Sequence, residues 1–488
     1  MSWLLPALVA APLLGAALTL VLGRRLVPQR IVTLSIVGGT AAGAIALLLH
    51  VDDAGPVTAQ MGGWPAPFGI TLIADRFSAI VLSVSTLMLA AVLVYAMAQL
   101  GRDAIDWWFH TKYLTLTAGV TLSLLTGDLF NLFVGFEVML VSSYVLLTVR
   151  STQREIRSTM SYVVINLLAS ALFLVTIAFT YGISGTMNLA DLSIRLAEVD
   201  PAASQTLSLL MLVVFGIKAA LFPLFMWLPD SYPTAPTPVT AIFAGLLTKV
   251  GVFVIIRTQT LLFPADEPSG LLLFIAGATM TVGVLGAIAQ NDVKRILSFH
   301  IVSQIGYMIM GLGLLSIAGL AAAVLYITHH IIVKTGLFLV AGVVEAEYGT
   351  GGLDRTGGLL HRRPVVAALF LPLALSLAGI PPFSGFVAKL ALVQEGLALG
   401  QGAIVAVSLA VSVLTLFSMT KIWGATFWGE EKESSGRAGR AELATTGVVL
   451  ALSLAVAATA GPLGELSLRA ATDLMDPSVY VSAVLGGN

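Results

Sequence analysis

The chain has 488 residues, of which 57% are hydrophobic and 10% are charged. A soluble domain has about one charged residue in four, so this composition excludes a water-soluble fold and indicates an integral membrane protein. The net charge of -1 and the lack of a Lys/Arg-rich tract exclude a basic nucleic-acid binder, and the lack of cysteine excludes disulfides, thiolate metal sites and Cys nucleophiles.

Apolar segments long enough to cross a bilayer predict an all-α, polytopic membrane protein with about 14 transmembrane helices. The expected spans are Trp3–Leu22, Ile31–Leu49, Phe77–Leu100, Phe109–Thr126, Leu129–Val149, Ser158–Gly182, Thr206–Trp227, Pro238–Thr258, Leu271–Gln290, Ile301–Ser316, Gly319–Val344, Pro364–Gly396, Ala403–Phe427 and Leu443–Leu463. If the loop 23–30 is cytoplasmic, alternation places sixteen of the 25 Lys and Arg residues in the cytoplasm, four outside and five within spans. The positive-inside rule then predicts that both termini lie outside.

The five cations expected deep within the spans are all lysines, and no arginine lies deep. They are Lys218, Lys249, Lys334, Lys389 and Lys421. A charge at the centre of a bilayer costs about 2.5–3.5 kcal/mol, which makes several accidental ones improbable. A desolvated lysine can lose its proton, whereas arginine stays charged. Four of these lysines are therefore candidate proton carriers, and Lys421, near the interface, is expected to snorkel.

Glu137 is the one deep acid, about eight residues into the fifth span and near mid-bilayer. A deep lysine on another helix would keep it charged, and Lys218 is the candidate partner. Such a pair could be a switch that releases a proton when it breaks, or an ion pair that clamps two helices. Near the outer end of the third span, Asp75 is expected to pair with the adjacent Arg76.

Two histidines, His329 and His330, lie in the middle of the eleventh span and point about 100° apart on a helix. Because the pKa of histidine is near neutral, one of them could pass protons between lysines. The other interpretation is a histidine bonded to neighbouring backbone or to Ser or Thr. The residues themselves leave open which of the two lies in a pathway.

The seventh expected span contains a helix-breaking proline beside a lysine. Pro223 cannot donate a backbone hydrogen bond, which frees the carbonyl of Ala219 next to Lys218. Open backbone inside a membrane is tolerated where protein buries it or where it lines a wet cavity. The seventh helix is therefore expected to be discontinuous.

The twelfth expected span is broken in the same way. Pro381 and Pro382 free the carbonyls of Leu377 and Ala378, and Lys389 follows about two turns later. An offset of five spans reverses orientation, as two inverted repeats over spans 4–8 and 9–13 require. The alternative is a pair of simple proline kinks. The predicted organisation is 1–108 with helices 1–3, 109–262 and 268–428 with the two repeats, and 440–488 with helix 14 and a tail.

Three long motifs, at residues 222–239 with 246–249, at 291–299 and at 379–386, resemble the signature of antiporter-like proton-translocating subunits. This family includes Mrp-type sodium/proton antiporter subunits and the antiporter-like subunits of respiratory complex I. The segment 62–70 resembles the D-type subunits of the Mrp branch. The resemblance implies fourteen helices with inverted repeats and a polar axis at mid-membrane. It assigns the family's proton-carrying positions to Glu137, Lys218, Lys249, His329 or His330, and Lys389. Lys334 is a further candidate only because it lies within a span.

The resemblance further implies a secondary transporter and not an enzyme, namely a proton-translocating subunit of a multisubunit Na+/H+ antiporter in a prokaryotic cell membrane. Its expected partners are the other subunits of that complex, and no cofactor or metal site is expected. One acid and several lysines make a poor sodium site, so sodium is expected to cross elsewhere in the complex or at a subunit interface. The alternatives are a proton-pumping subunit of complex I and a stand-alone carrier of a small solute.

Overall fold

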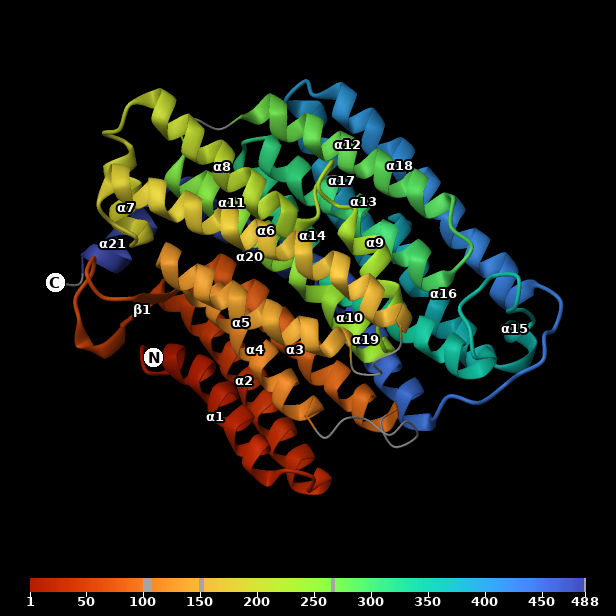
Figure 1. The fold of residues 1–488 in the computed structure, drawn as a ribbon. Helices are drawn as coiled ribbons and strands as arrows, with labels where there is room; N and C mark the ends of the chain where they lie inside the picture. The colour runs from red at the N-terminus through yellow and green to blue at the C-terminus, as the bar shows by residue number, and fades with distance from the viewer. Residues whose placement is uncertain (100–107, 149–152, 265–267, 487–488) are drawn as a thin grey trace.

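The computed structural model describes residues 1–99, 108–148, 153–264 and 268–486 of the chain. Its helices lie side by side in one elongated bundle (Figure 1). One end of the bundle carries a β hairpin with α7 and α21, and we call it the hairpin end. The other end carries α15, and we call it the α15 end. The expected span ends at Leu100 and Val149 lie outside the described residues.

Twelve helical segments are long and apolar enough to cross a membrane among the described residues. They are α1 (Leu4–Leu22), α2 (Leu26–Ala54), α3 (Arg76–Gln99), α5 (Leu129–Leu147), α6 (Gln153–Ser184), α8 (Pro201–Ala219), α10 (Thr237–Ile242) with the π-helical segment Phe243–Leu247 and α11 (Thr248–Leu262), α12 (Ser269–Ile288), α13 (Val293–Gly313), α14 (Ile317–Tyr348), α18 (Gly402–Ile422) with the π-helical segment Trp423–Trp428, and α19 (Arg440–Ala458). The chain is therefore a polytopic helical membrane protein.

The other two expected spans are present as shorter helices. α4 (Phe109–Leu125) has 17 residues and forms the fourth span. The twelfth span is divided into α16 (Pro364–Ala378) and α17 (Ser384–Ala398), with 15 residues each. All fourteen expected spans thus correspond to helices, although several differ from their predicted ends.

A small hairpin adds β structure to the chain that the sequence predicts as all-α. β1 (Val57–Gln60) pairs antiparallel with β2 (Thr71–Ala74), with Val57 opposite Ala74. A short 3-10 turn, Met61–Gly63, follows β1. Strands of four residues are too short for an alternating pattern to stand out from the apolar background.

Shorter helices occupy the two ends of the bundle and the tail. They are α7 (Leu189–Leu196), α9 (Trp227–Ser231) followed by the 3-10 turn Tyr232–Thr234, α15 (Leu359–Arg362), α20 (Ala460–Met475) and α21 (Pro477–Leu485). The tail predicted after the last span is therefore helical. α20 packs against α14 and α3, and α21 packs against α7.

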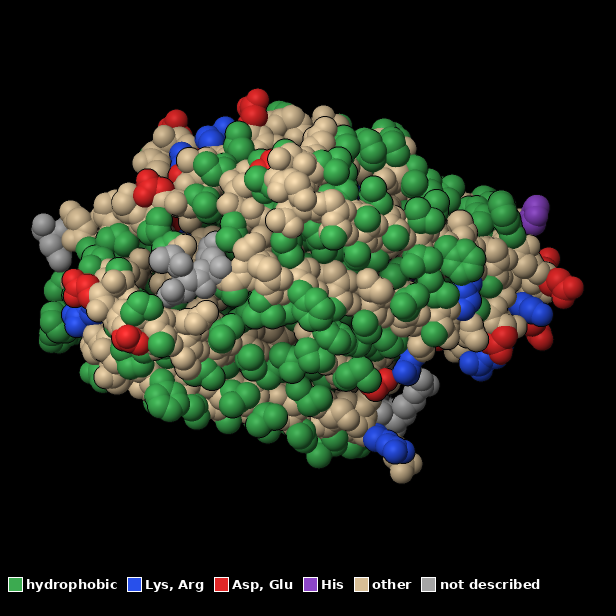
Figure 2. All heavy atoms as spheres, turned by 90° about the horizontal axis from the view of Figure 1, so that it is seen from above, with side chains coloured by type: hydrophobic (Ala, Val, Ile, Leu, Met, Phe, Trp, Pro, Cys, Tyr) green, Lys and Arg blue, Asp and Glu red, His purple; other side chains and the backbone are tan. Residues whose placement is uncertain are grey.

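The core lies around α14 and the α10–α11 segment, whose apolar windows are entirely buried. α14 packs against α13, α16, α17, α19 and α20. Figure 1 shows α1 and α2 along one flank and α12 and α18 along the other. In Figure 2 apolar side chains cover most of the visible face, while charged side chains lie mainly toward its edges. This distribution suits a surface that faces lipid.

Candidate functional site

Glu137 and Lys218 are linked through a serine and do not form the direct ion pair that the sequence predicts. On α6, the Ser170 hydroxyl donates a hydrogen bond to Oε1 of Glu137 on α5. The same hydroxyl oxygen accepts a hydrogen bond of 3.0 Å from Nζ of Lys218 on α8. Ser170 therefore stands between the acid and the base, where its hydroxyl can accept from one group and donate to the other.

Lys218 lies at the end of α8, where the helix is interrupted. α8 ends at Ala219, and Ala220 adopts a left-handed conformation with φ of 61°. Nζ of Lys218 also donates to the carbonyl of Asn166 on α6 at 3.2 Å. A cavity of about 10 Å³ adjoins Lys218 and reaches Leu247, and this volume is about what one water molecule needs.

Lys249 lies directly after the π-helical segment. Its Nζ donates to the carbonyl of Ala244 at 2.5 Å and to Oγ1 of Thr248 at 3.2 Å. A π turn shifts the backbone hydrogen-bond pattern by one residue, and such turns occur often at functional sites. Gly251, two residues later, brings α11 close to the end of α8, because a Cβ there would lie 2.7 Å from the backbone nitrogen of Ala219. The two lysines therefore lie on helices in close contact.

His329, His330 and Lys334 lie on α14 in the interior of the bundle, and all three are buried. Nδ1 of His329 is 2.8 Å from Oγ of Ser384, the first residue of α17. Among the described residues, Nε2 of His329, both ring nitrogens of His330 and Nζ of Lys334 have no hydrogen-bond partner. Of the two histidines, His329 is therefore the one in contact with the break in the twelfth span.

Lys389 on α17 lies against the broken end of α16. Its Nζ donates to the carbonyls of Leu377 and Ala378 at 3.2 and 3.1 Å, the two carbonyls that the prolines were predicted to free. It also donates to Oγ of Ser412 on α18 at 3.1 Å. The ring of Tyr307 lies 4.5 Å from the ammonium group, within cation–π range. Lys389 thus has neutral partners throughout its surroundings.

Lys421 differs from the deep lysines in its surroundings. It is half-buried near the end of α18, and its Nζ donates to the carbonyls of Ile288 and Gln290 at 3.0 and 2.7 Å. These carbonyls lie at the end of α12, where a cation interacts favourably with the helix dipole. These contacts favour a structural role for Lys421 near the membrane interface.

His300 is a buried titratable residue that the sequence analysis did not select. Its Nε2 is 2.5 Å from Oγ of Ser418 on α18, and its Nδ1 has no partner among the described residues. The expected tenth span began at Ile301, which left His300 in a loop, whereas α13 begins at Val293 and encloses it. A longer apolar window would have found it.

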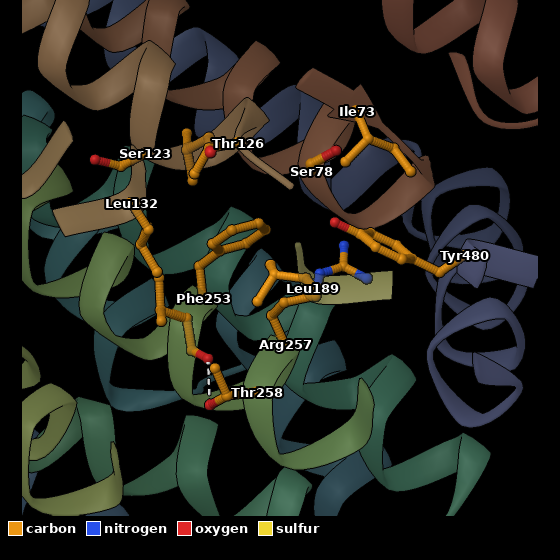
Figure 3. A pocket seen from close by; sticks show the side chains of 12 residues that line it. Ile73, Ser78, Ser123, Thr126, Leu132, Leu189, Phe253, Arg257, Thr258 and Tyr480 are labelled. Carbon is orange, nitrogen blue, oxygen red and sulfur yellow. Dashed lines mark hydrogen bonds between the residues drawn. The ribbon is translucent and has the colours of Figure 1, made fainter. Parts of the chain in front are cut away.

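A second buried charged group lies at the hairpin end. Asp75 is paired with Arg257 of α11, with 2.5 Å between Oδ2 and Nη2, and not with Arg76 as predicted. Arg76 instead pairs with Asp52 at 3.1 Å and Asp473 at 2.7 Å. Arg257, which the positive-inside count places on the outer side, is buried near the end of α11. Figure 3 shows its guanidinium beside Phe253 and Tyr480.

Two titratable groups near this end lie outside the spans. Burial raises the pKa of the Asp128 carboxyl between α4 and α5, although the backbone N–H groups of Asn131 and Phe130 hold it down. Burial also raises the pKa of the Tyr480 phenol on α21, which stays neutral at physiological pH. Among the described residues, no group of three or more His, Asp or Glu side chains could hold a metal ion.

The fold and the buried cations define a class of protein, a polytopic membrane protein with lysines and histidines inside its bundle. Residues 126–415 match the model of the family described as NADH:quinone oxidoreductase/Mrp antiporter, TM. The chain belongs to this family.

Curated antiporter subunits and a solved Mrp complex have high similarity to the chain. The chain is 43% identical over 464 residues to the D subunit of the Na(+)/H(+) antiporter of Alkalihalophilus pseudofirmus, covering 94% of each. It is 36% identical to the protein of the same name from Bacillus subtilis, covering 99% of each. A chain of the Mrp complex from Dietzia sp. DQ12-45-1b has a TM-score of 0.95 at 36% identity, with 100% of both chains covered.

A chain of respiratory complex I from Thermus thermophilus has a TM-score of 0.83 at 23% identity, covering 97% of this chain and 100% of that one. At this identity the likeness is one of fold.

Proposed function

We propose that this chain is the proton-carrying D-type subunit of a multisubunit Na+/H+ antiporter. It moves protons through the membrane along Glu137, Lys218, Lys249, the histidines of α14 with Lys334, and Lys389. Other subunits of the complex complete the transporter and carry Na+. The chain acts as part of a secondary transporter and catalyses no chemical conversion.

The observation that carries the proposal is the line of titratable side chains across the bundle, all of them buried except the half-buried Glu137. It begins at Glu137 on α5 and ends at Lys389 on α17. The members around α14 are close enough to act on one another electrostatically, as Lys249 does on His330 and Lys334, and Lys389 on His329. Lys218 and Lys249 are connected by the contact between α8 and α11. A structural clamp needs one pair of charges, whereas a relay needs a series of groups within reach of one another.

The partners of these cations favour proton exchange. Lys218, Lys249 and Lys389 each donate to a backbone carbonyl or a hydroxyl, which are neutral acceptors. A lysine with neutral acceptors can become uncharged without leaving an unpaired carboxylate in the membrane. Buried polar atoms without protein partners normally bind water, and the ring nitrogens of His330 and Nζ of Lys334 are such atoms. Water would therefore fill the gaps between the carriers.

The hairpin end faces the outside in this proposal, with both termini there and the α15 end in the cytoplasm. The positive-inside rule supports this orientation. The curated relatives support the antiporter over a complex I subunit, because they are up to 43% identical and carry antiporter names. The complex I chain shares the fold at 23% identity.

The test is Na+-dependent proton movement in everted vesicles from antiporter-deficient cells that express the whole complex. Glu137→Gln, Lys218→Met and Lys389→Met should each lower antiport at least about tenfold, the effect of ~1.4 kcal/mol on a barrier, at normal assembly. Lys421→Met is the matched control, because it removes a half-buried lysine outside the line, and it should keep most of the activity. Full antiport in the three variants would refute the relay.

A further inference from the structure

Arg257 is the one arginine among the described residues that is buried. α11 carries it toward the hairpin end, and Asp75 fixes its position. Asp75 lies between β2 and α3, and its Oδ1 accepts a hydrogen bond of 2.9 Å from the backbone nitrogen of Ser78. The carboxylate therefore holds the N-terminus of α3 and the guanidinium at once.

Three aromatic rings enclose the guanidinium. Its central carbon lies 5.6 Å from the centre of the Phe77 ring, 5.7 Å from Phe253 and 5.0 Å from Tyr480. Phe77 and Phe253 are stacked with their centres 4.7 Å apart, and Tyr480 comes from α21 (Figure 3). Rings this close stabilise the cation and exclude water from around it, so the charge acts in a medium of low dielectric constant.

A small cavity with a mostly apolar lining and a few hydroxyl groups lies beside Arg257. Its volume is about 10 Å³, and the side chains of Ser78, Ser123, Thr126 and Thr258 are among those that line it (Figure 3). This volume is about what one water molecule needs, and hydroxyl groups supply the partners that a buried water requires. A water molecule here would stand next to a fixed positive charge.

Arg257 stands between the proposed carriers and the hairpin end of the bundle. Lys249 and Arg257 lie on the same helix, eight residues or about 12 Å apart. The residues between them, 250–256, are Gly or apolar, and Phe253 is one of the stacked rings. A proton that left Lys249 along α11 toward the hairpin end would have to pass the guanidinium.

We propose, building on the function proposed above, that Arg257 is an electrostatic barrier that closes this end of the proton path. A guanidinium cannot lose its proton, so it cannot relay one as the lysines can. A fixed positive charge beside a narrow water site repels hydronium and Na+, and arginine excludes cations in this way in membrane pores. Asp75 and the three rings hold the charge in place.

The alternative is that the Asp75–Arg257 pair only clamps α3 to α11. Both interpretations predict weaker assembly when the pair is disrupted. They differ in proton permeability, because loss of a clamp does not by itself create a path that runs through Lys249.

The experiment measures passive proton entry into proteoliposomes that contain the complete purified complex, without Na+, driven by a K+ diffusion potential. The neutral pair Asp75→Asn with Arg257→Gln keeps the shape and a hydrogen bond, and it should raise proton entry at least about tenfold. Adding Lys249→Met should abolish this leak. Arg257→Lys retains the charge and should stay closed. Asp191→Asn with Arg195→Gln, an ion pair within α7 at the same end, is the matched control and should not leak.

The barrier proposal would be wrong if the complex with the neutral pair does not leak protons, or if its proton leak persists with Lys249→Met. If the double variant does not assemble, Asp75→Asn with Arg257→Met is a second neutral pair for the same measurement, in which the Asn amide oxygen can still accept from the backbone of Ser78. The two proposals fail separately. Wild-type complex without Na+-dependent proton movement would refute the function, whereas a tight variant with normal antiport would refute only the barrier.

Discussion

At the scale of single residues, Lys218, Lys249 and Lys389 are each held by an oxygen that a helix defect or a neighbouring helix exposes, whereas Nζ of Lys334 has no partner among the described residues. Ala244 offers its carbonyl to Lys249 at the π turn, and Leu377 offers its carbonyl to Lys389 at the end of α16. Such acceptors stabilise the charged lysine and cost little when it becomes neutral, unlike a carboxylate partner. Glu137 is the exception in the line, and the structure separates it from Lys218 by one hydroxyl.

Ser170→Ala tests whether that hydroxyl couples Glu137 to Lys218. Without it, the carboxylate and the ammonium each lose a hydrogen bond, and the proton path between them loses its intermediate. Loss of one such bond costs about 1–2 kcal/mol, so Na+-dependent proton movement should fall roughly 5–30-fold at normal assembly.

The matched control for Ser170→Ala is Ser142→Ala on α5. The Ser142 hydroxyl donates to the carbonyl of Val138 in its own helix. Its loss should leave antiport near the wild-type rate. Equal activities of the two variants would show that Ser170 is not part of the coupling.

At the scale of elements, the sequence predicted the helix breaks but not every partner. A proline interrupts a helix because it has no backbone N–H to donate. This rule predicted the free carbonyls to which Lys389 donates. At Lys218 the seventh span is also broken, but the chain turns at Ala220 and the lysine donates to a carbonyl on α6. The hairpin, the π turn before Lys249 and the helical tail have no strong local signature, since tertiary packing determines them.

Gly385→Ala tests whether the close approach of α17 to α16 is needed. A Cβ at Gly385 would lie 1.8 Å from the carbonyl oxygen of Ser376 and 2.9 Å from Cε1 of His329. α17 would have to move away, which breaks the contact between Ser384 and His329 and shifts Lys389. Overpacking of this kind costs about 1–3 kcal/mol, so both the melting temperature of the purified complex and its antiport should fall.

Gly402→Ala is the control for Gly385→Ala. Gly402 begins α18, the next helix along the chain, and a Cβ there meets nothing within 4 Å. Both substitutions add the same methyl group in a first helical turn, so the difference between them isolates the clash. A Gly385→Ala complex as stable and active as the Gly402→Ala complex would contradict the required close approach.

At the scale of the whole molecule, two matched turns at opposite ends support the predicted inverted repeats. Asp128 caps α5 and bridges to Asn188 at the hairpin end, and Asp292 caps α13 and bridges to Gly352 at the α15 end. Each aspartate begins the second span of a predicted repeat, and each bridge reaches the loop after the third span. This correspondence is what repeats of opposite orientation require, and the repeat boundaries stay a prediction.

The hairpin end also joins the first and last parts of the chain. Arg76 on α3 contacts Asp52 on α2 and Asp473 on α20, and Arg469 on α20 contacts Asp52 as well. α20 packs against both α3 and α14. The C-terminal helices are therefore tied to the N-terminal ones across the centre of the bundle, an arrangement that no local pattern in the sequence predicts.

A double-mutant cycle on Arg76 and Asp473 measures this tie. Each side chain is less than one-fifth exposed, so the pair is only partly screened by solvent. Asp473→Ala should lower the melting temperature of the complex by about 2–4 °C, and Arg76→Ala should lower it more, because Arg76 also contacts Asp52. The double variant should fall little below Arg76→Ala, because the Arg76–Asp473 interaction is already lost there. Asp191 and Arg195, which pair at 3.0 Å within α7, provide the control cycle. Its effects should be small, because this pair connects no distant elements. Additive losses at Arg76 and Asp473 would mean that this ion pair does not hold α20 to α3, and the Arg469–Asp52 pair would then be the remaining ionic tie of α20 to the N-terminal helices.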